Sequence, residues 1–492
     1  MGIIIRQSIK SSLFNYLGIA LGYINMVWFF PSILSEERFG LLRVVISVSM
    51  LLAQFGEFGL SNTLNRFFPY FKRSRSQNGA FIAYICLLAS AFTIVLLLAL
   101  FSFKEFFFSH AYDHEVHFSE HFPAILVITI SVVFSEILYA LSRASYKAVF
   151  PSFIKETLLR FLQTFSILLF YFDMVDFEVF VLLFASTYFI SLLTMFTYLY
   201  FKGLIRFRHP ALITRVKSPS EILTYSFYVF LNKLPNRAIN QIDVLMLGAL
   251  AGLKSAGAYS IAFFIAEVVR IPARNISLIS NPLIAEAWKN NELGEINKIY
   301  RQSSINQLLI GGFFLILVLS NVNDFTFYLQ NKYSGIFPVL ALLGLAKVFD
   351  MTTGINGLII ANSTYYRYSL IFSIALLILA VISNYLLIPP YGIRGAALAT
   401  ALSVFLLNGV KTLFVLYKFN MQPFTIKTLV ALVLLALTYL LTSLVTIDFG
   451  HIINIVVRIL LSSIFFLPAI YFLKVSPEIN GVIKALLNRI RS

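Results

Sequence analysis

Long apolar runs recur along almost the whole chain, each about as long as a lipid bilayer is thick. A membrane-spanning helix needs about 20 mostly apolar residues, and the links between the runs are far shorter than the ~50 residues of a folded domain. This length predicts about fourteen spans, near residues 11–34, 40–65, 79–103, 123–142, 156–172, 178–201, 221–250, 257–283, 303–321, 336–360, 369–388, 393–417, 428–446 and 452–473. The chain is therefore predicted to be an all-α membrane protein.

The composition agrees with a lipid solvent and argues against several other classes of protein. Only 12% of the residues are charged and 59% are hydrophobic, whereas soluble domains carry about 25% charged residues. The single cysteine, Cys86, excludes an intramolecular disulfide and a thiolate metal site. The apolar stretch after Arg6 and Lys10 is too long for a signal peptide, so we interpret it as the first span.

Basic residues are distributed unevenly between alternate links of this topology. Links on the side of the N-terminus contain most of the Lys and Arg, and the opposite links contain Arg38, Lys104, Lys254 and Lys332. Because Lys and Arg favour the cytoplasmic side, both termini are predicted to be cytoplasmic. The formal net charge of +16 is scattered over short links rather than gathered in a basic domain, which argues against nucleic-acid binding.

Two short outside turns suggest an internal repeat. The turns at residues 34–41 and 253–259 each place a glycine, Gly40 or Gly257, at the start of the next helix. Parallel repeats with a site between the two halves are a recurring design of transporters. The expected divisions are an N-lobe of spans one to six (1–205), a C-lobe of spans seven to twelve (206–420), and spans thirteen and fourteen with a cytoplasmic tail (421–492).

Ionisable residues within the predicted spans are costly, so each is a candidate functional residue. Away from the span ends, basic residues outnumber acidic ones, which indicates an anionic substrate. The basic residues are Arg43, Arg160, Lys233, Arg237, Arg270, Arg274, Lys347, Lys411 and Arg458, and the acidic residues are Glu57, Glu136, Asp243, Glu267 and Asp350.

Two pairs of these basic residues flank a proline, and the members of each pair share a helix face. Prolines at this depth are expected to interrupt the helices and free backbone groups that line a cavity. Because guanidinium and ammonium groups suit phosphate oxygens, we predict an anion site near the midplane. Its candidate residues are Lys233 and Arg237 around Pro235, Arg270 and Arg274 around Pro272, and additionally Arg43 and Arg66.

Internal ion pairing is the alternative role for the same charges, because buried charges usually find partners. The alternative pairs join Glu267 to Arg270, Lys347 to Asp350, and Asp243 to Arg237 or Arg274. Arg66 lies near the predicted cytoplasmic side, where its side chain can reach water. The candidates for a coupling or counter-charge role are Glu57, Glu136, Asp243, Glu267, Lys347 and Asp350. No cofactor is expected, and the driving force (a proton or sodium gradient, or the membrane potential) is left open.

The predicted outside link at 104–122 contains four of the six histidines of the chain. His110, His114, His117 and His121 would form one stripe if the link were helical. Such a stripe suits zinc binding or pH sensing, but a link this short offers few groups to support a metal. We therefore interpret it as a polar loop and expect no metal site.

Three segments resemble one known family: residues 18–69, residues 242–260 and the link at residues 384–400. In the link, Pro389 and Pro390 are expected to end one helix, Gly392 to permit a turn, and Gly395 to allow close helix contact. These segments, and the span count, resemble the Wzx-type oligosaccharide flippases of polysaccharide export. That family belongs to the multidrug/oligosaccharidyl-lipid/polysaccharide (MOP) exporter superfamily.

The resemblance implies a V-shaped pair of six-helix lobes around a central cavity, with two extra C-terminal helices that guide a lipid tail. It implies transport of a polyprenyl-pyrophosphate-linked oligosaccharide to the outer leaflet by alternating access, for O-antigen, capsule or exopolysaccharide biosynthesis. The basic cluster would hold the pyrophosphate and acidic sugars. The expected partners are this lipid-linked oligosaccharide, membrane lipids and a polysaccharide polymerase, and the protein is expected to be a monomer without enzymatic activity.

Three other functions stay open at this point. A lipid-linked peptidoglycan-precursor flippase would share the span count and the cationic cavity. A drug/cation antiporter of the same superfamily should have carboxylates dominating the cavity of its N-lobe. A membrane polymerase, ligase or glycosyltransferase usually carries a sizeable outside loop, for which the link at 104–122 is the one candidate.

Overall fold

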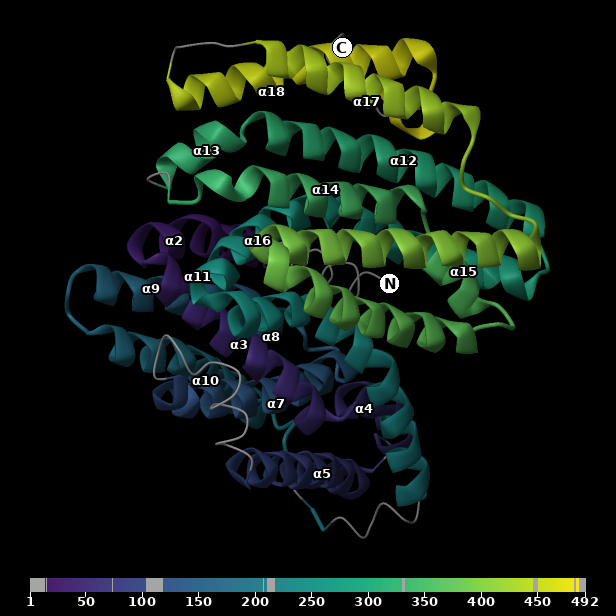
Figure 1. Cartoon of the computed structure of the whole chain (residues 1–492). Coiled ribbons are helices and arrows are strands. Elements are labelled where there is room, and N and C mark those ends of the chain that lie inside the picture. Colours follow the sequence, from purple (N-terminus) through teal and green to yellow (C-terminus); the bar gives the residue numbers. More distant parts are fainter. Residues whose placement is uncertain are drawn as a thin grey trace. The chain divides into compact units, whose positions relative to one another are not determined.

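The protein consists of helices joined by short links in the computed structural model (Figure 1). The structure describes residues 14–485 apart from 15, 73, 103–117, 207, 210–216, 330–331, 446–449 and 482–483, and no strand occurs among the residues described. Ten of the described helices are long and apolar enough to cross a membrane, or eleven when one bent pair is counted. The all-α membrane class is thus confirmed, whereas the number of spans stays a prediction.

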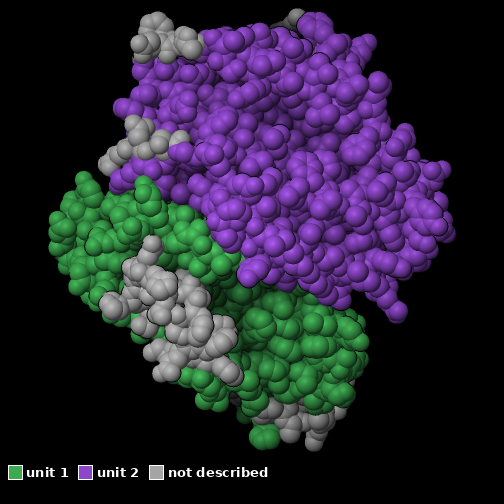
Figure 2. Space-filling view, viewed as in Figure 1, with its two compact units in different colours: residues 1–257 green, residues 258–492 purple. Residues whose placement is uncertain are grey.

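The chain divides into two compact units, residues 1–257 and 258–492 (Figure 2). The first unit contains η1 (Ile24–Phe29), α2 (Phe30–Ile33), α3 (Glu36–Glu57), α4 (Leu60–Phe71), α5 (Arg75–Ser102), η2 (Phe118–His121), α7 (Phe122–Ala144), α8 (Val149–Ser152), η3 (Phe153–Leu158), α9 (Leu159–Tyr171), α10 (Phe177–Phe201) and the first part of α11 (Pro219–Lys289). The lobe boundary expected at residue 205 stays a prediction.

The second unit contains the remainder of α11 and the helices that follow it. These are α12 (Leu293–Ser320), α13 (Val322–Tyr328), η5 (Ser334–Ile336), α14 (Phe337–Thr352), α15 (Asn356–Asn362), α16 (Arg367–Phe419), α17 (Ile426–Leu444) and α18 (His451–Leu473). Helices α14 and α15 meet at an angle of 47°, and they form the bent pair.

Helices α11 and α16 are too long to be single spans. They contain 71 and 53 residues, whereas about 20 residues cross a bilayer. Each is interrupted by a glycine with non-helical backbone angles, Gly252 in α11 (φ 82°, ψ 163°) and Gly392 in α16 (φ 54°, ψ −130°). Each helix therefore has room for two of the predicted spans, one on either side of its glycine.

The link within α16 confirms one expectation and corrects another. A Cβ atom at Gly395 would lie 1.9 Å from the carbonyl oxygen of Leu387, so the two halves of α16 approach as closely as predicted. Pro389 and Pro390 do not end the helix, since helical backbone continues through both and the turn occurs at Gly392. The fixed φ of proline is close to the helical value, whereas only glycine adopts a positive φ without steric cost.

Within the first unit, residues 34–41 of the first turn pack against residues 253–257 of the second. A Cβ atom at Gly40 would lie 1.8 Å from the carbonyl oxygen of Leu253, and one at Gly257 would lie 2.6 Å from that of Glu36. The Lys254 ammonium lies 3.2 Å from the Glu36 carboxylate. Gly40 of the first turn and Gly257 of the second therefore lie on opposite sides of one close backbone contact.

Each unit has its own apolar interior. In the first unit, Phe67, Phe81 and Ile137 join α4, α5 and α7. In the second, Leu308 and Phe466 lie in a cluster that joins α12, α14, α17 and α18. Large apolar side chains are also exposed on the outer faces of α5, α10, α16, α17 and α18, because lipid tails are as apolar as leucine and solvate these faces.

We predict that Gly395→Ala destabilises the protein by about 1–3 kcal/mol, the usual cost of forcing extra atoms into a packed contact. The control is Gly409→Ala on the same helix, where a Cβ atom would meet nothing within 4 Å. The measurement is the midpoint of thermal unfolding in detergent, followed by size-exclusion chromatography. Equal midpoints for the two variants would contradict the close contact.

Candidate functional site

The junction of α3 and α4 is a helix break in the first unit. Phe58 and Gly59 both have left-handed backbone angles there (φ 45° and 75°). The Glu57 carboxylate accepts hydrogen bonds from the backbone amides of Gly59 at 3.1 Å and Ser61 at 2.6 Å. An acidic group at a helix N-terminus satisfies its free amides and its dipole, which matters most where water is absent. Glu57 therefore caps α4.

Two residues of α11 hold this break in place. The Lys233 ammonium lies 3.6 Å from the Glu57 carboxylate and donates to the Ser61 hydroxyl at 2.9 Å. The Ser226 hydroxyl donates to the carbonyl oxygen of Phe58 at 2.6 Å. Lys233, a predicted anion ligand, thus serves as the counter-charge of Glu57. The coupling role considered for Glu57 stays a prediction.

A second carboxylate of the first unit lies among basic groups. Lys155 donates to Glu136 at 2.7 Å, and Lys233 and Arg237 both act electrostatically on the same carboxylate. The Arg237 side chain is exposed and has no ion pair with any described residue. Around Glu57 and Glu136, the first unit therefore contains more cations than anions.

The other candidates of the first unit lie elsewhere on its helices. Arg43 is buried on α3, and its charged or polar neighbours include Tyr188 of α10 and Arg160 of α9. Arg66 is exposed on α4, with its guanidinium carbon 4.1 Å from the centre of the Tyr225 ring. Asp243 is buried on α11. Cation–π contact with Tyr225 explains the position of Arg66 without an anionic ligand.

A network of charges joins α11 and α14 in the second unit. The Lys347 ammonium lies 2.6 Å from the Glu267 carboxylate. The Arg270 guanidinium lies 3.4 Å from Asp350 and 3.9 Å from Glu267. The proposed pair of Arg270 with Glu267 is therefore present. The expected pair of Lys347 with Asp350 is wrong, because Lys347 contacts Glu267 on the neighbouring helix instead.

Helix α16 extends this network. The Asn408 amide donates to the Asp350 carboxylate at 2.9 Å, and Lys411, one turn further along, is an electrostatic neighbour of Asp350 and Arg270. One turn beyond Arg270 on α11, the exposed Arg274 has no ion-pair or hydrogen-bond partner within the described part of the chain. The second unit thus also has a surplus of basic groups.

The prolines beside these basic residues do not interrupt α11. Helical backbone runs through both Pro235 and Pro272, and Gly252 is the residue with non-helical angles. The expectation of a broken helix at either proline was therefore wrong. Each proline still lacks an amide hydrogen, which leaves the carbonyl oxygens of Leu231 and Val268 without their usual helical donor.

Three residues that take part in these charge networks are not predicted from the sequence. Lys155 lies just before the predicted span at 156–172, so the sequence does not mark it as a charge within the membrane. In the structure it donates a hydrogen bond to Glu136. Asn408 is uncharged, and Ser61 is one of many serines in apolar runs. No periodic signal in the sequence distinguishes these residues, because their role depends on which neighbouring helix they contact.

Arg458, the single charged residue predicted inside the last two spans, fixes α18 to α13. Its guanidinium donates to the buried Asp324 carboxylate and, at 3.1 Å, to the carbonyl oxygen of Ser320. His451 Nδ1 lies 2.7 Å from the same carboxylate. Arg458 therefore serves in helix packing.

Of the four clustered histidines, the structure describes His121, and His110, His114 and His117 lie outside the described residues. The His121 side chain is 5% exposed and stacks edge-on against Phe177. No group of three or more metal-ligating side chains occurs among the residues that the structure describes. Burial lowers the pKa of His121, and the nearby Glu120 and Glu178 act in the opposite direction.

A family model described as "Polysaccharide biosynthesis protein" matches residues 4–288, more than half of the chain. The chain belongs to this family. The teichuronic acid biosynthesis protein TuaB of Bacillus subtilis (strain 168) is 23% identical over 154 residues, which are 30% of this chain. The matched region spans about a third (31%) of TuaB.

Solved structures of transporters have the same fold as this member of the polysaccharide biosynthesis family. The lipid II flippase MurJ in an inward closed conformation is similar with a TM-score of 0.69 at 16% identity, over 95% of this chain and 99% of MurJ. An inward-facing multidrug resistance MATE transporter of the MOP superfamily has a TM-score of 0.63 at 15% identity, over 85% of this chain and 98% of the transporter. The resemblance to the Wzx-type exporters of that superfamily is confirmed.

We predict that Glu57→Leu lowers the midpoint of thermal unfolding more than Glu57→Gln does. Leucine leaves the amides of Gly59 and Ser61 without an acceptor, at about 1–3 kcal/mol each, whereas glutamine keeps one oxygen. Glu37→Gln, an exposed change on the same helix, is the control and should unfold like the wild type. If Glu57→Leu were as stable as the control, Glu57 would not be a helix cap.

A pH dependence is predicted for His121. Because its pKa is lower in the folded protein, the unfolded chain binds the proton more readily. The stability that the neutral imidazole contributes is therefore complete above about pH 6.5 and is lost as the pH falls towards the folded pKa. His121→Phe should therefore reduce the loss of thermal stability on acidification, measured as the midpoint of thermal unfolding. Identical pH profiles of the wild type and His121→Phe would contradict this expectation.

Proposed function

We propose that this protein is a flippase that moves a polyprenyl-pyrophosphate-linked oligosaccharide from the inner to the outer leaflet of the bacterial inner membrane. The cargo would serve the biosynthesis of a surface polysaccharide such as O-antigen, capsule or exopolysaccharide. Membership of the polysaccharide biosynthesis family supports the pathway class. The transporter fold supports movement of the cargo by alternating access.

The observation that supports the proposal is the surplus of basic groups around the carboxylates of the predicted spans, which is present in both units. Arg237 and Arg274 have no ion pair with described residues, although their neighbours Lys233 and Arg270 do. An uncompensated guanidinium in a span is costly unless a ligand or water-filled cavity serves it. Pyrophosphate is a fitting ligand because guanidinium groups bind phosphate oxygens with two parallel hydrogen bonds.

The function of a drug/cation antiporter is disfavoured because the candidate carboxylates are already paired with cations of the protein. Glu57 is engaged with two backbone amides and Lys233, and Glu136 is engaged with Lys155. Glu267 and Asp350 are paired with Lys347 and Arg270. A cationic drug would have to compete with these protein cations for each carboxylate. A peptidoglycan-precursor flippase, which shares a cationic requirement, is the rival that the experiment below must separate.

Several features complete the proposal. The transporter would act as a monomer, with both termini in the cytoplasm, and would supply a polysaccharide polymerase on the outer side. A proton or sodium gradient, or the membrane potential, would drive the cycle. The last two helices would guide the polyprenyl chain, since the charge of Arg458 is neutralised by Asp324.

We predict that Arg274→Ala abolishes export of the surface polysaccharide while protein levels and thermal stability stay at those of the wild type. Arg274→Lys keeps the positive charge and should retain part of the export. Arg270→Ala should lower both export and stability, because it removes a partner of Asp350 and Glu267. The measurement is surface polysaccharide in a deletion strain that carries each variant, with the membrane level of the protein determined alongside.

Normal export by Arg274→Ala would remove this residue from the anion site. Loss of viability on deletion, rather than loss of the surface polysaccharide, would favour the peptidoglycan-precursor flippase. Synthesis of glycan by the purified protein alone would favour an enzyme.

A further inference from the structure

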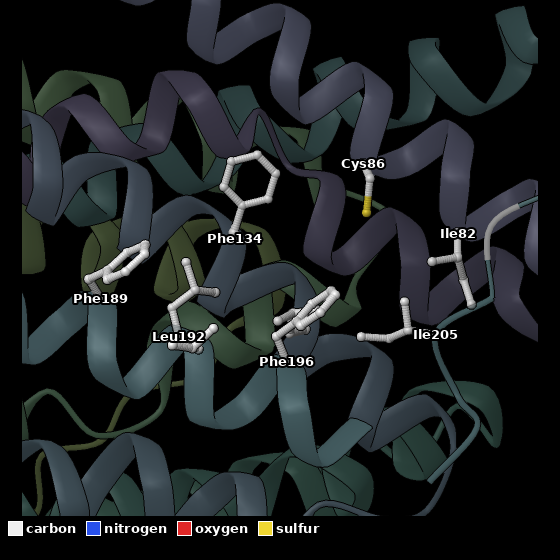
Figure 3. A pocket seen from close by; sticks show the side chains of 9 residues that line it. Ile82, Cys86, Phe134, Phe189, Leu192, Phe196 and Ile205 are labelled. Atoms are coloured by element: carbon white, nitrogen blue, oxygen red, sulfur yellow. The ribbon is translucent and has the colours of Figure 1, made fainter. Parts of the chain in front are cut away.

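An apolar groove of about 280 Å³ lies between α5, α7 and α10 of the first unit (Figure 3). Its lining includes Ile82 and Cys86 of α5, Phe134 and Leu138 of α7, and Leu192 and Phe196 of α10. The Cys86 side chain and the Phe196 ring point towards the same space from opposite walls (Figure 3). The groove lies apart from Lys233 and Arg237, whose helix contributes no lining residue.

The groove opens on a surface that is solvated by lipid. Phe189 and Leu193 also line it, and their side chains are 52% and 53% exposed. Exposed apolar side chains continue on both neighbouring helices, with Leu87 on α5 and Ile190 on α10. Water does not stably occupy a site that offers no polar partner. The occupant that fits this groove in a membrane is therefore a hydrocarbon chain.

Two arginines follow one lining residue of the groove in the chain. Ile205, just beyond the end of α10, is a lining residue, and Arg206 and Arg208 follow it. The backbone amide of Arg208 donates to the carbonyl oxygen of Gly79 at 3.4 Å, and a Cβ atom at Gly79 would lie 2.6 Å from the carbonyl oxygen of Arg206. This backbone contact holds the arginine segment against the start of α5.

Both arginines are available to an anion. Their side chains are exposed, and neither has an ion pair with a residue that the structure describes. They lie beyond the last turn of α10, at the predicted cytoplasmic end of the span, where the phosphates of a bilayer lie. Basic pockets at this level between membrane helices bind anionic headgroups.

We propose that this groove binds one anionic membrane phospholipid, with an acyl chain against Cys86 and Phe196 and its phosphate at Arg206 and Arg208. From Phe189 to Phe196 the groove wall extends about 10 Å along the helix, which suits part of an acyl chain that enters from the bilayer surface. The cations proposed for the transported pyrophosphate lie within spans. A phosphate at the bilayer surface belongs instead to a resident lipid.

Photocrosslinking in nanodiscs tests this site without any transport step. The full-length protein is placed in phosphatidylcholine with a trace of either phosphatidylglycerol or phosphatidylcholine that carries a diazirine on its acyl chain. After irradiation, adducts are mapped by peptide mass spectrometry. We expect adducts in the peptides that contain Cys86 and Phe196, with more from phosphatidylglycerol than from phosphatidylcholine of the same chains.

Two pairs of variants separate the groove from the headgroup site. Leu193→Trp should fill the groove and remove the adducts, whereas Ile190→Trp, on the exposed face of the same helix but outside the lining, should keep them. The double variant Arg206→Gln and Arg208→Gln should lower phosphatidylglycerol labelling roughly fivefold per lost charge. Its phosphatidylcholine labelling should not change.

Equal labelling of the wild-type protein by the two lipids would overturn the proposal, because the groove would then merely be solvated by bulk chains. Displacement of phosphatidylglycerol by added undecaprenyl pyrophosphate would also overturn it, since the occupant would then be the transported lipid. Neither result depends on the proposed flippase activity, so the two proposals fail separately.

Discussion

A helix break within a predicted membrane span leaves backbone amides that the protein itself must satisfy, because lipid chains offer no hydrogen-bond acceptor. At the α3–α4 break, the Glu57 carboxylate meets this requirement for Gly59 and Ser61. An ionised carboxylate at that depth in turn needs a cation, which Lys233 supplies from α11. The capping of one helix therefore fixes the position of another, and the Ser226 contact with Phe58 strengthens the same junction.

The need of each carboxylate for a cationic partner also determines how the charges of the second unit are paired. Glu267 and Asp350 neutralise Lys347 and Arg270, and Asn408 completes the bonding of Asp350. Arg274 stands outside these pairs, as Arg237 does in the first unit, within the described residues. The Arg270, Glu267 and Asp350 side chains are only partly buried, so these pairs remain partly solvated. They join α11 to α14 and α16, and the guanidinium groups outside the pairs are the ones that we propose to engage the anionic cargo.

The all-α membrane class could be predicted from the sequence, because bilayer thickness sets the length of an apolar run. The turn at Gly392 and the contact at Gly395 could be predicted as well, since positive φ and close backbone approach both require glycine. The contacts between helices could not be predicted from the sequence. Lys347 pairs with Glu267 rather than Asp350 because of how α11 and α14 are rotated, and the sequence contains no record of that rotation. Pro235 and Pro272 were predicted to break α11, yet the φ of proline is compatible with a continuous helix.

The central claim is that the basic surplus serves a lipid-linked pyrophosphate cargo, and a deletion strain tests this most directly. Lipids are extracted from that strain, and the sugars linked to undecaprenyl carriers on the cytoplasmic side are identified by mass spectrometry. The account predicts accumulation of a pyrophosphate-linked oligosaccharide together with loss of the surface polysaccharide. A normal lipid profile with normal surface polysaccharide would contradict it and would direct attention to drug-sensitivity assays.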